Sequence, residues 1–522
     1  MRRTGALGLK RREAFLLPLA ALAARRARAE DTSRPLRISW REAIPNLDPY
    51  SNQLRAGFAL AHEIWDTLVY RNPVSFAIEP LLATSWAWEG DYSLVFALRP
   101  GVRWHDDSAF GAEDVAYTIN MIASDRRLSA PSVYRWLAGA EVIDSLRVRV
   151  RLKRPMPAAL EYFAMAVWIL PRESRVRSGR FARAAVGTGP YRVAAADGTS
   201  RIELTRFEGY YAGSPKGRPA IKDIVIRVVP DATTELADLL SGAADWIWKF
   251  DPDRIPAILR NPGLIATQAE SMRIGYISFD AAGRTGPDNP LSSEKVRQAI
   301  SHALDRGAMA RGLVGARARP LDAPCYPTQV GCVTVDAVHY DYDPDRARQL
   351  LAEAGYPNGF TVQLVTYEPP RWSAVMQHYL RAVGIDAQVI QLPPGEVVLR
   401  AIEGQTRMQA GDWGSYSIND VSAILPHFFA FTPEDYTRDP RVRALIEEAG
   451  ATRDTARRNA AYAQAIHAIT AHADWLPLYT YTVTYAFSRD LDFMPCADEL
   501  PRFFLCRWKD TGASGLLPRF RG

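Results

Sequence analysis

The sequence has no apolar run long enough to cross a bilayer, no internal repeat, and only four cysteines among its 522 residues. The apolar run at residues 14–24 is far shorter than the roughly 20 residues of a spanning helix. A second apolar run, at residues 160–170, is interrupted by Glu161 and flanked by prolines, so it predicts a buried helix. A membrane-spanning protein is therefore disfavoured.

Motifs that would mark an enzyme are also missing. His62 and Glu63 begin like a zinc-protease helix, but Asp66 stands where the second histidine is required. There is no G-x-S-x-G, no Walker lysine and no C-x-x-C pair. His467 and His472 are five residues apart, a spacing that does not bring them to one helical face. The sequence therefore predicts no catalytic site, no metal site and no cofactor.

Little net charge remains once the N-terminal segment is set aside. Basic residues precede the apolar run, and residues 27–29 are Ala-Arg-Ala, with small residues at the spacing of signal-peptide cleavage. Residues 1–29 hold eight of the 64 Lys and Arg and one of the 58 Asp and Glu, which leaves 56 against 57 and a net charge of −1. A mature chain without basic excess disfavours nucleic-acid binding.

We therefore expect residues 1–29 to be a secretory signal. Arg11 and Arg12 also resemble a twin-arginine signal, although one residue too many separates them from Phe15. The export route stays open between the general and the twin-arginine pathway.

The four cysteines form two pairs that are close in sequence. Cys325 is near Cys332, and Cys496 is near Cys506. In an exported chain such pairs close as disulfides, and neither spacing is that of a zinc site. Three connectivities are possible for four cysteines, and four unpaired buried thiols are the alternative.

The 493 residues after the signal are too many for one core and predict two or three domains with alternating strands and helices. Residues 92–98 alternate like a half-buried strand, and we expect residues 102–104 to return beside it as a hairpin. Asp343 followed by Pro344 predicts a helix start. Strand signals at residues 360–365 and 386–392 flank a helix at 371–383, which implies a parallel pair.

Several blocks, in this order, resemble one family. They are Pro80-Leu-Leu-Ala-Thr-Ser-Trp86, then Phe96-x-Leu-Arg99-x-Gly101-Val-x-Trp-His105-Asp106, then Ala112-Glu-Asp114-Val, and later Gly187-Thr-Gly-Pro-Tyr191. They are similar to the signature of extracytoplasmic solute-binding proteins of ABC importers, in the peptide/opine/nickel family, family 5. Asp107 stands where that family usually has glycine, so we expect a turn of different build there.

The resemblance implies an α/β fold with two lobes, strands that cross between them, and an extra N-terminal subdomain. We expect lobe I at residues 30–70, 186–275 and 481–522, the extra subdomain at 71–185, and lobe II at 276–480. It also implies a periplasmic, monomeric receptor that delivers a small-molecule ligand to an ABC permease at the inner membrane.

The resemblance places the ligand near residues 411–420, where the family carries W-x-x-D-x-x-D-P. Trp413 matches the tryptophan, and Tyr416 replaces the aspartate that takes the ligand ammonium in peptide-binding relatives. A phenol cannot neutralise an ammonium group, so we expect a ligand other than a peptide with a free N-terminus. Asn419 and Asp420 are candidate hydrogen-bond partners. The alternative is that Tyr416 only packs and another carboxylate serves.

Four further residues are ligand candidates. Arg371 stands where some relatives place a carboxylate-binding arginine, although an exposed surface arginine is the alternative. Gln53, Leu54 and Arg55 stand at an offset where peptide-binding relatives line the cleft. A di- or oligopeptide receptor remains the alternative within the family, and a secreted hydrolase or a metal-chelate scavenger is the alternative from another class.

Overall fold

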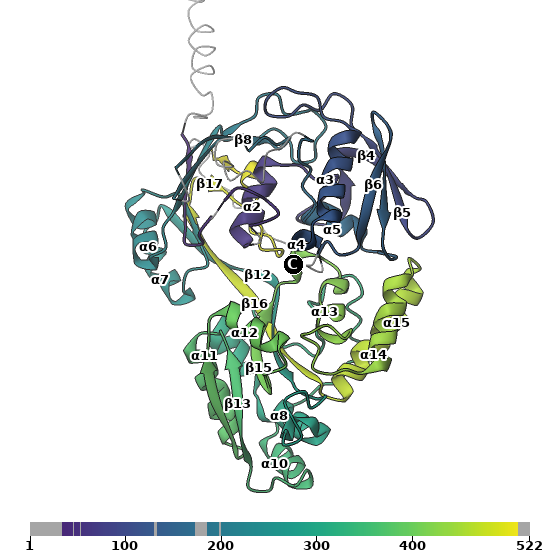
Figure 1. Ribbon diagram of the computed structural model, residues 1–522. Coiled ribbons are helices and arrows are strands. Elements are labelled where there is room, and N and C mark those ends of the chain that lie inside the picture. The colour runs from purple at the N-terminus through teal and green to yellow at the C-terminus, as the bar shows by residue number, and fades with distance from the viewer. Residues whose placement is uncertain are drawn as a thin grey trace, which may run out of the picture.

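The computed structural model describes residues 34–44, 46–52, 54–129, 133–172, 185–197 and 200–509. Within these ranges, the largest sheet has ten strands in the order β14-β13-β15-β12-β16-β11-β1-β10-β9-β8. Two long antiparallel strands, β12 (Leu264–Phe279) and β16 (Trp475–Ser488), run through its middle and connect an upper and a lower half of the molecule (Figure 1).

The upper half, called lobe I here, contains one end of this sheet. Its strands are β1 (Leu36–Trp40), β8 (Tyr191–Asp197), β9 (Arg201–Arg206), β10 (Asp223–Val228) and β11 (Trp246–Trp248). Its helices include α2 (Arg55–Ile64), α6 (Ala232–Ser241) and α7 (Ile255–Ile258). Two small antiparallel pairs complete the strands of this region: β2 (Val69–Arg71) with β3 (Ile78–Pro80), and β17 (Leu491–Asp492) with β18 (Arg507–Trp508).

The lower half, lobe II, contains the other end of the sheet. Strand β13 (Phe360–Thr366) is parallel to both β14 (Ile385–Gln391) and β15 (Met408–Trp413). The helix between β13 and β14 is α11 (Pro370–Arg381), so the predicted parallel pair with a crossover helix is confirmed. The other helices of this half are α8 (Glu294–Ala303), α9 (Arg306–Met309), α10 (Pro344–Glu353), α12 (Pro394–Ile402), α13 (Leu425–Phe429), α14 (Pro440–Ala451) and α15 (Thr455–Ala471).

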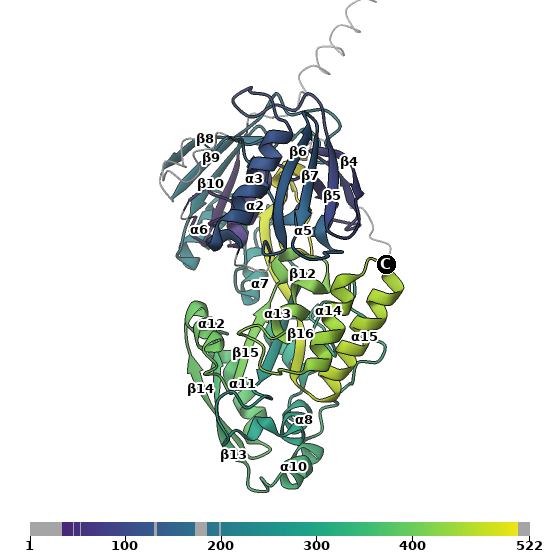
Figure 2. The same ribbon diagram turned by 45° about the vertical axis from the view of Figure 1, so that its right-hand side comes forward.

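A separate antiparallel sheet forms the extra subdomain. Its strands are β4 (Ala83–Trp88), β5 (Ser93–Leu98), β7 (Arg147–Leu152) and β6 (Leu137–Asp144), in that order, and it carries α3 (Ala112–Ser124), α4 (Arg126–Ser129) and α5 (Ala159–Met165). Figure 2 shows this sheet beside lobe I and above α14 and α15. The predicted helix at residues 160–170 is correct for its first part only, because α5 ends at Met165.

The predicted hairpin partner of β5 is wrong. Strand β5 pairs with β4 on one edge and with β7 on the other, so no edge is left for residues 102–104. Arg103 instead makes an isolated bridge with Ala109, and Trp104 is buried against Phe110. Residues 100 and 101 do form a turn, but the chain that follows it does not pair with β5.

Asp107 has a backbone conformation that glycine adopts readily. Its φ is +68°, in the left-handed region that favours glycine. Aspartate tolerates this region better than most residues do. The different build expected for this turn stays a prediction.

Gly187 and Gly189 are required by a close backbone approach. A Cβ atom at Gly187 would lie 1.8 Å from the Ile64 carbonyl oxygen, and one at Gly189 would lie 2.6 Å from the Glu63 carbonyl oxygen. The Gly189 amide donates a hydrogen bond of 2.9 Å to Ile64 O. The glycines thus let the start of β8 pack directly on the end of α2.

One of the two candidate disulfides is present. Cys325 and Cys332 are bonded, as predicted. Cys496 and Cys506 are buried free thiols, so that prediction is wrong. Each of these sulfurs contacts a local carbonyl, Met494 O at 3.6 Å and Arg502 O at 3.9 Å. The segment between them contains Asp498 and Glu499, whose buried carboxylates pair with arginines.

Across the described ranges, we find no helix with the length and apolar character needed to cross a membrane.

Candidate ligand-binding cleft

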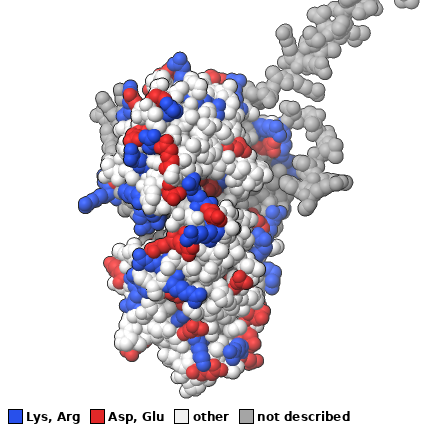
Figure 3. Space-filling view, turned by 90° about the vertical axis from the view of Figure 1, so that its right-hand side faces the viewer, with Lys and Arg blue, Asp and Glu red and all other residues white. Residues whose placement is uncertain are grey.

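A cavity of about 730 Å³ lies where the long strands pass between the lobes. Its walls come from α2 and residues 249–252 of lobe I, from β15 and the start of α11 in lobe II, and from β12 and β16. Ligand pockets usually have volumes of roughly 300–1,000 Å³. Figure 3 shows one side of the molecule, where charges of both signs gather at the level at which the halves meet.

The charge network of the cleft is centred on Arg273. The pairing of β12 with β16 shifts register between Glu270 and Ile274, and such irregularities re-aim a side chain out of the regular ladder. Arg273 lies within this irregular stretch. Its Nε is 3.0 Å from Oε1 of Glu499 and its Nη2 is 2.9 Å from Oε2, and it also pairs with Asp412 of β15.

Glu499 has a second cation. Nε of Arg55, at the start of α2, lies 3.3 Å from its Oε2. Burial alone would raise the pKa of Glu499, but the guanidinium groups of Arg273 and Arg55 outweigh it and hold that pKa well below its usual range. Glu499 is therefore ionised and neutralised by the protein itself.

Glu42 is neutralised in the same way. Its carboxylate pairs with Lys249 and accepts a hydrogen bond of 2.9 Å from the Ala56 amide. Although burial opposes ionisation, Lys249 lowers the pKa of Glu42. The Lys249 ammonium also lies 4.3 Å from the ring centroid of Trp248.

The cavity lining has one cation more than its carboxylates require. Among the described lining residues, the carboxylates are Glu42, Asp412 and Glu499, and each contacts a cation of the protein. Arg371 is the additional cation. It lies 3.9 Å from Asp253, whose side chain is 85% exposed, so water screens this pair strongly.

The turn after β15 has an unusual backbone. Ser415, Tyr416 and Ser417 have φ values of +48°, +51° and +62°, although none of them is glycine. A left-handed residue of this kind costs on the order of 1–3 kcal/mol, and it persists only where its surroundings hold it. Both serines are buried, and Ser415 and Tyr416 line the cavity.

Lobe I holds this turn from one side. Arg71, which is fully buried, donates a hydrogen bond of 2.5 Å to the Ser417 carbonyl and pairs with Asp498 and Glu161. The Ser417 hydroxyl donates to the Asp498 carbonyl at 2.5 Å. The turn thus belongs to the contact between the lobes as well as to the cavity wall.

Aromatic rings form the apolar part of the wall. Trp413 stacks on His427 with a centroid distance of 4.3 Å, and it meets Tyr416 edge to face at 5.3 Å. On the other side Trp372 stacks on Tyr481 at 5.3 Å. Such rings bury flat apolar ligand surface and leave polar edges for hydrogen bonds.

A buried carboxyl group lies behind this aromatic wall. Glu368 accepts a hydrogen bond of 2.7 Å from the Tyr481 hydroxyl. Burial, together with the nearby Asp412 carboxylate, raises the pKa of Glu368 to about 8. At neutral pH this carboxyl group is therefore mainly protonated.

The residues proposed from sequence fall into three groups. Trp413, Tyr416, Arg371, Leu54 and Arg55 line the cavity.

Asn419 and Asp420 are not among the lining residues. Both carboxylate oxygens of Asp420 accept hydrogen bonds from Arg458, at 2.6 and 2.8 Å. The backbone N–H of Asn419 donates to the Glu161 carboxylate at 3.1 Å. Gln53 lies outside the described residues.

Sequence reasoning missed Arg273, Asp412 and Glu499. Asp412 immediately precedes Trp413, so the motif that identified Trp413 could also have indicated Asp412. Arg273 and Glu499 meet across 226 residues of sequence, and no local pattern marks either of them.

Comparisons with known proteins agree with this architecture. Residues 77–436 match the model of bacterial extracellular solute-binding proteins, family 5 Middle. A glutathione-binding protein, GsiB of Pectobacterium atrosepticum, is 28% identical over 482 residues, covering 87% of this chain and 90% of that protein.

Solved structures share the fold. HbpA2 of Haemophilus parasuis has a TM-score of 0.78 and 22% identity, covering 91% of this chain and 100% of that one. NikA of Brucella suis, in complex with Fe(III)-EDTA, has a TM-score of 0.79 and 20% identity, with the same coverage of both chains.

The two lobes, the long strands between them and the cavity at their junction define a solute-binding receptor of the periplasmic-binding-protein type. The chain belongs to the bacterial extracellular solute-binding proteins, family 5, the receptors that deliver substrates to ABC importers.

Proposed function

We propose that this receptor binds a small organic solute through a carboxylate or a similar anionic group and delivers it to an ABC permease. One observation carries the proposal. The three carboxylates of the cavity lining are paired with Arg273, Arg55 and Lys249, whereas the fourth cation, Arg371, has only a solvent-screened partner. An anion is the ligand group that this imbalance accommodates.

The position of Arg371 supports an anion site. It lies in the first turn of α11, a twelve-residue helix with no acidic residue in that turn. The backbone N–H groups and the dipole at a helix N-terminus attract anions. A guanidinium group adds a fork of donors that matches a carboxylate.

The other lining residues have separate roles in this proposal. Trp413 and Tyr416 supply an apolar face for the ligand body, and Leu54 and Arg55 border it. Asp420 has no ligand-binding role in this proposal, because Arg458 donates hydrogen bonds to both of its carboxylate oxygens. An ammonium group would find the carboxylates of the lining already neutralised, which argues against a peptide anchored by its N-terminus.

Glutathione is the first anion to test. The relative that is 28% identical is named a glutathione-binding protein. Glutathione carries two carboxylates and one ammonium group, so it supplies the anion that Arg371 would take.

The proposal also covers the export, the location and the oligomeric state of the chain. We propose that the chain is exported, by the general or the twin-arginine route, and acts as a periplasmic monomer without catalysis. The Cys325–Cys332 disulfide supports an oxidising compartment.

A thermal-shift screen of the mature protein tests the ligand class. The compounds are glutathione, dipeptides, opines, sugars and metal chelates. A ligand at a hundredfold its dissociation constant stabilises the folded state by about 2.7 kcal/mol. The proposal expects shifts with carboxylate-bearing solutes, and shifts with sugars alone would reject it.

A further inference from the structure

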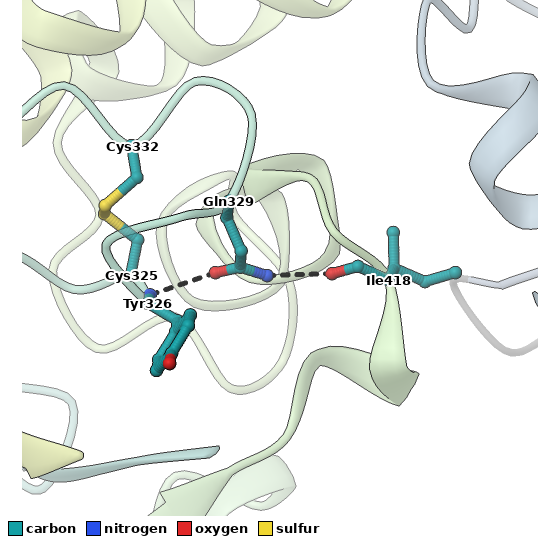
Figure 4. The surroundings of a disulfide bond; sticks show 5 residues. All are labelled: Cys325, Tyr326, Gln329, Cys332 and Ile418. Atoms are coloured by element: carbon teal, nitrogen blue, oxygen red, sulfur yellow. Dashed lines mark hydrogen bonds between the residues drawn. A yellow bond between two sulfur atoms is a disulfide. The ribbon is translucent and has the colours of Figure 1, made fainter. Parts of the chain in front are cut away.

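The disulfide loop lies directly against the segment that follows the ligand-facing turn. Gln329, inside the loop closed by Cys325 and Cys332, is 4% exposed. Its side chain spans a gap between two backbones (Figure 4). Oε1 accepts from the Tyr326 amide at 3.0 Å, and Nε2 donates to the Ile418 carbonyl at 2.9 Å. The amide group thus ties the loop to the residue after Ser417.

Backbone hydrogen bonds extend this contact. The Val330 amide donates to Asn419 O at 3.1 Å, and the Val421 amide donates to Val330 O at 3.0 Å. Residues 330 and 420 form an isolated parallel bridge. The loop therefore contacts the backbone of residues 418–421 immediately after the left-handed turn, where Ile418 and Asp420 are extended.

Gly331 permits this close packing. Its φ is +87°, and a Cβ atom there would lie 2.8 Å from Val421 and 2.7 Å from Tyr462. The loop also reaches the long strand β12, because the Tyr326 hydroxyl donates to Glu270 at 3.1 Å. The disulfide joins the two ends of this loop and so holds in place the residues that make these contacts.

We propose that Gln329, held by the Cys325–Cys332 loop, is a positioning residue that keeps the cavity-lining turn at Ser415, Tyr416 and Ser417 in its left-handed conformation. The inference rests on the proposed function in one respect: the turn is taken as part of the ligand site.

The C-terminal end of the turn is anchored from two sides. Arg71 and Asp498 of lobe I hold Ser417 from one side, and Gln329 holds Ile418 from the other. Three successive non-glycine residues with positive φ relax toward ordinary backbone conformations once one anchor is removed. Such relaxation moves Tyr416 away from its edge-to-face contact with Trp413.

Amide hydrogen exchange of the ligand-free full mature chain tests the inference. Gln329→Met removes both hydrogen bonds at nearly constant volume. Only the bond to Ile418 reaches the segment after the turn. Loss of that one bond corresponds to roughly fivefold to tenfold faster exchange, which we expect for the amides of residues 417–421. The control is Gln377→Met, because Gln377 donates to Ala387 O at 2.7 Å, within lobe II. Equal exchange of residues 417–421 in both variants would overturn the inference.

Reduction of the unmodified protein provides a second route that needs no substitution. The chain has four cysteines, and Cys496 and Cys506 are already thiols, so dithiothreitol acts on the Cys325–Cys332 bond alone. We expect faster exchange in the same residues. Unchanged exchange after complete reduction would show that the loop does not depend on its disulfide and would contradict the proposal.

A binding measurement separates this inference from the proposed function. The probe is S-methylglutathione, whose blocked thiol cannot attack the disulfide. We expect its dissociation constant to rise roughly fivefold to tenfold in Gln329→Met and to stay unchanged in Gln377→Met. If the unsubstituted protein binds no carboxylate-bearing solute, the proposed function fails, whereas the exchange result still decides the role of Gln329.

Discussion

Arg273 and Glu499 form a two-point ion pair in the cleft wall, with Nε–Oε1 and Nη2–Oε2 distances of 3.0 and 2.9 Å. Arg273 belongs to a strand that passes between the lobes, and Glu499 belongs to the C-terminal segment. Because both oxygens of the carboxylate face guanidinium nitrogens, little of its charge remains for a ligand. Glu499 is therefore a poor partner for a ligand cation, in keeping with the anion site that we propose at Arg371.

Arg371→Ala is expected to weaken binding of a carboxylate-bearing solute about tenfold, because a charge-assisted hydrogen bond is lost at a partly exposed site. Isothermal titration calorimetry measures this change. Arg381→Ala, on the same helix, is the control and should bind like the unsubstituted protein. A dissociation constant that is the same in both variants would remove Arg371 from the site.

Glu368→Gln is expected to change how stability depends on pH. The carboxyl pKa rises from 4.5 to about 8 on folding, owing to burial and to Asp412, whereas Arg273 and the Tyr481 hydroxyl oppose the rise. The folded state therefore holds a proton that the unfolded state releases between these two values. Within that window, the free energy of unfolding of the unsubstituted protein should fall relative to that of Glu368→Gln as the pH rises. The expected fall is up to about 1.4 kcal/mol per pH unit.

Urea unfolding of both proteins from pH 5 to pH 9 checks this. Glu63 carries a similarly raised pKa, of about 8, in both proteins and cancels in the difference. A difference in unfolding free energy that does not vary with pH would contradict the assignment of Glu368 as a protonated buried group.

Arg458→Ala is expected to lower the free energy of unfolding by about 3–5 kcal/mol, because it leaves Asp420 buried without its cation. Arg457→Ala is the neighbouring control. Its partner Glu448 is exposed, so a change below about 1 kcal/mol is expected. Chemical denaturation compares the two variants. Equal and small losses would show that Asp420 does not depend on Arg458.

Gly187→Ala is expected to destabilise the protein by several kcal/mol, at least about 3, because the new Cβ meets the Ile64 carbonyl. Gly450→Ala is the matched control in α14. A Cβ there meets open space, so alanine should be neutral or stabilise by up to about 1 kcal/mol. Melting temperatures of the two variants test this difference, and similar values would be inconsistent with the packing of β8 on α2.

Local rules predicted much of the fold. Asp343 caps α10 through the Arg346 amide at 2.9 Å, as the Asp-Pro pattern indicated. The β13–α11–β14 unit followed from spacing alone, because a parallel pair needs a crossover helix. The blocks around Pro80 and Gly187 identified the family.

Non-local features were beyond the sequence. Which strands pair with β5 depends on how the sheet is arranged in space, where β4 and β7 occupy its two edges. The pairing of Arg273 with Glu499 joins residues far apart in the chain. The left-handed backbone at Tyr416 is set by Arg71 and Gln329, whereas its own residue type favours ordinary conformations.

The central claim is that an anionic group, and not an ammonium group, anchors the ligand. Calorimetric titration of two derivatives of S-methylglutathione tests it most directly. The N-acetyl derivative lacks the ammonium group, and the dimethyl ester lacks both carboxylates. The account predicts that the N-acetyl derivative binds and that the dimethyl ester does not. Binding of the ester with loss of binding by the N-acetyl derivative, or binding of neither, would contradict it.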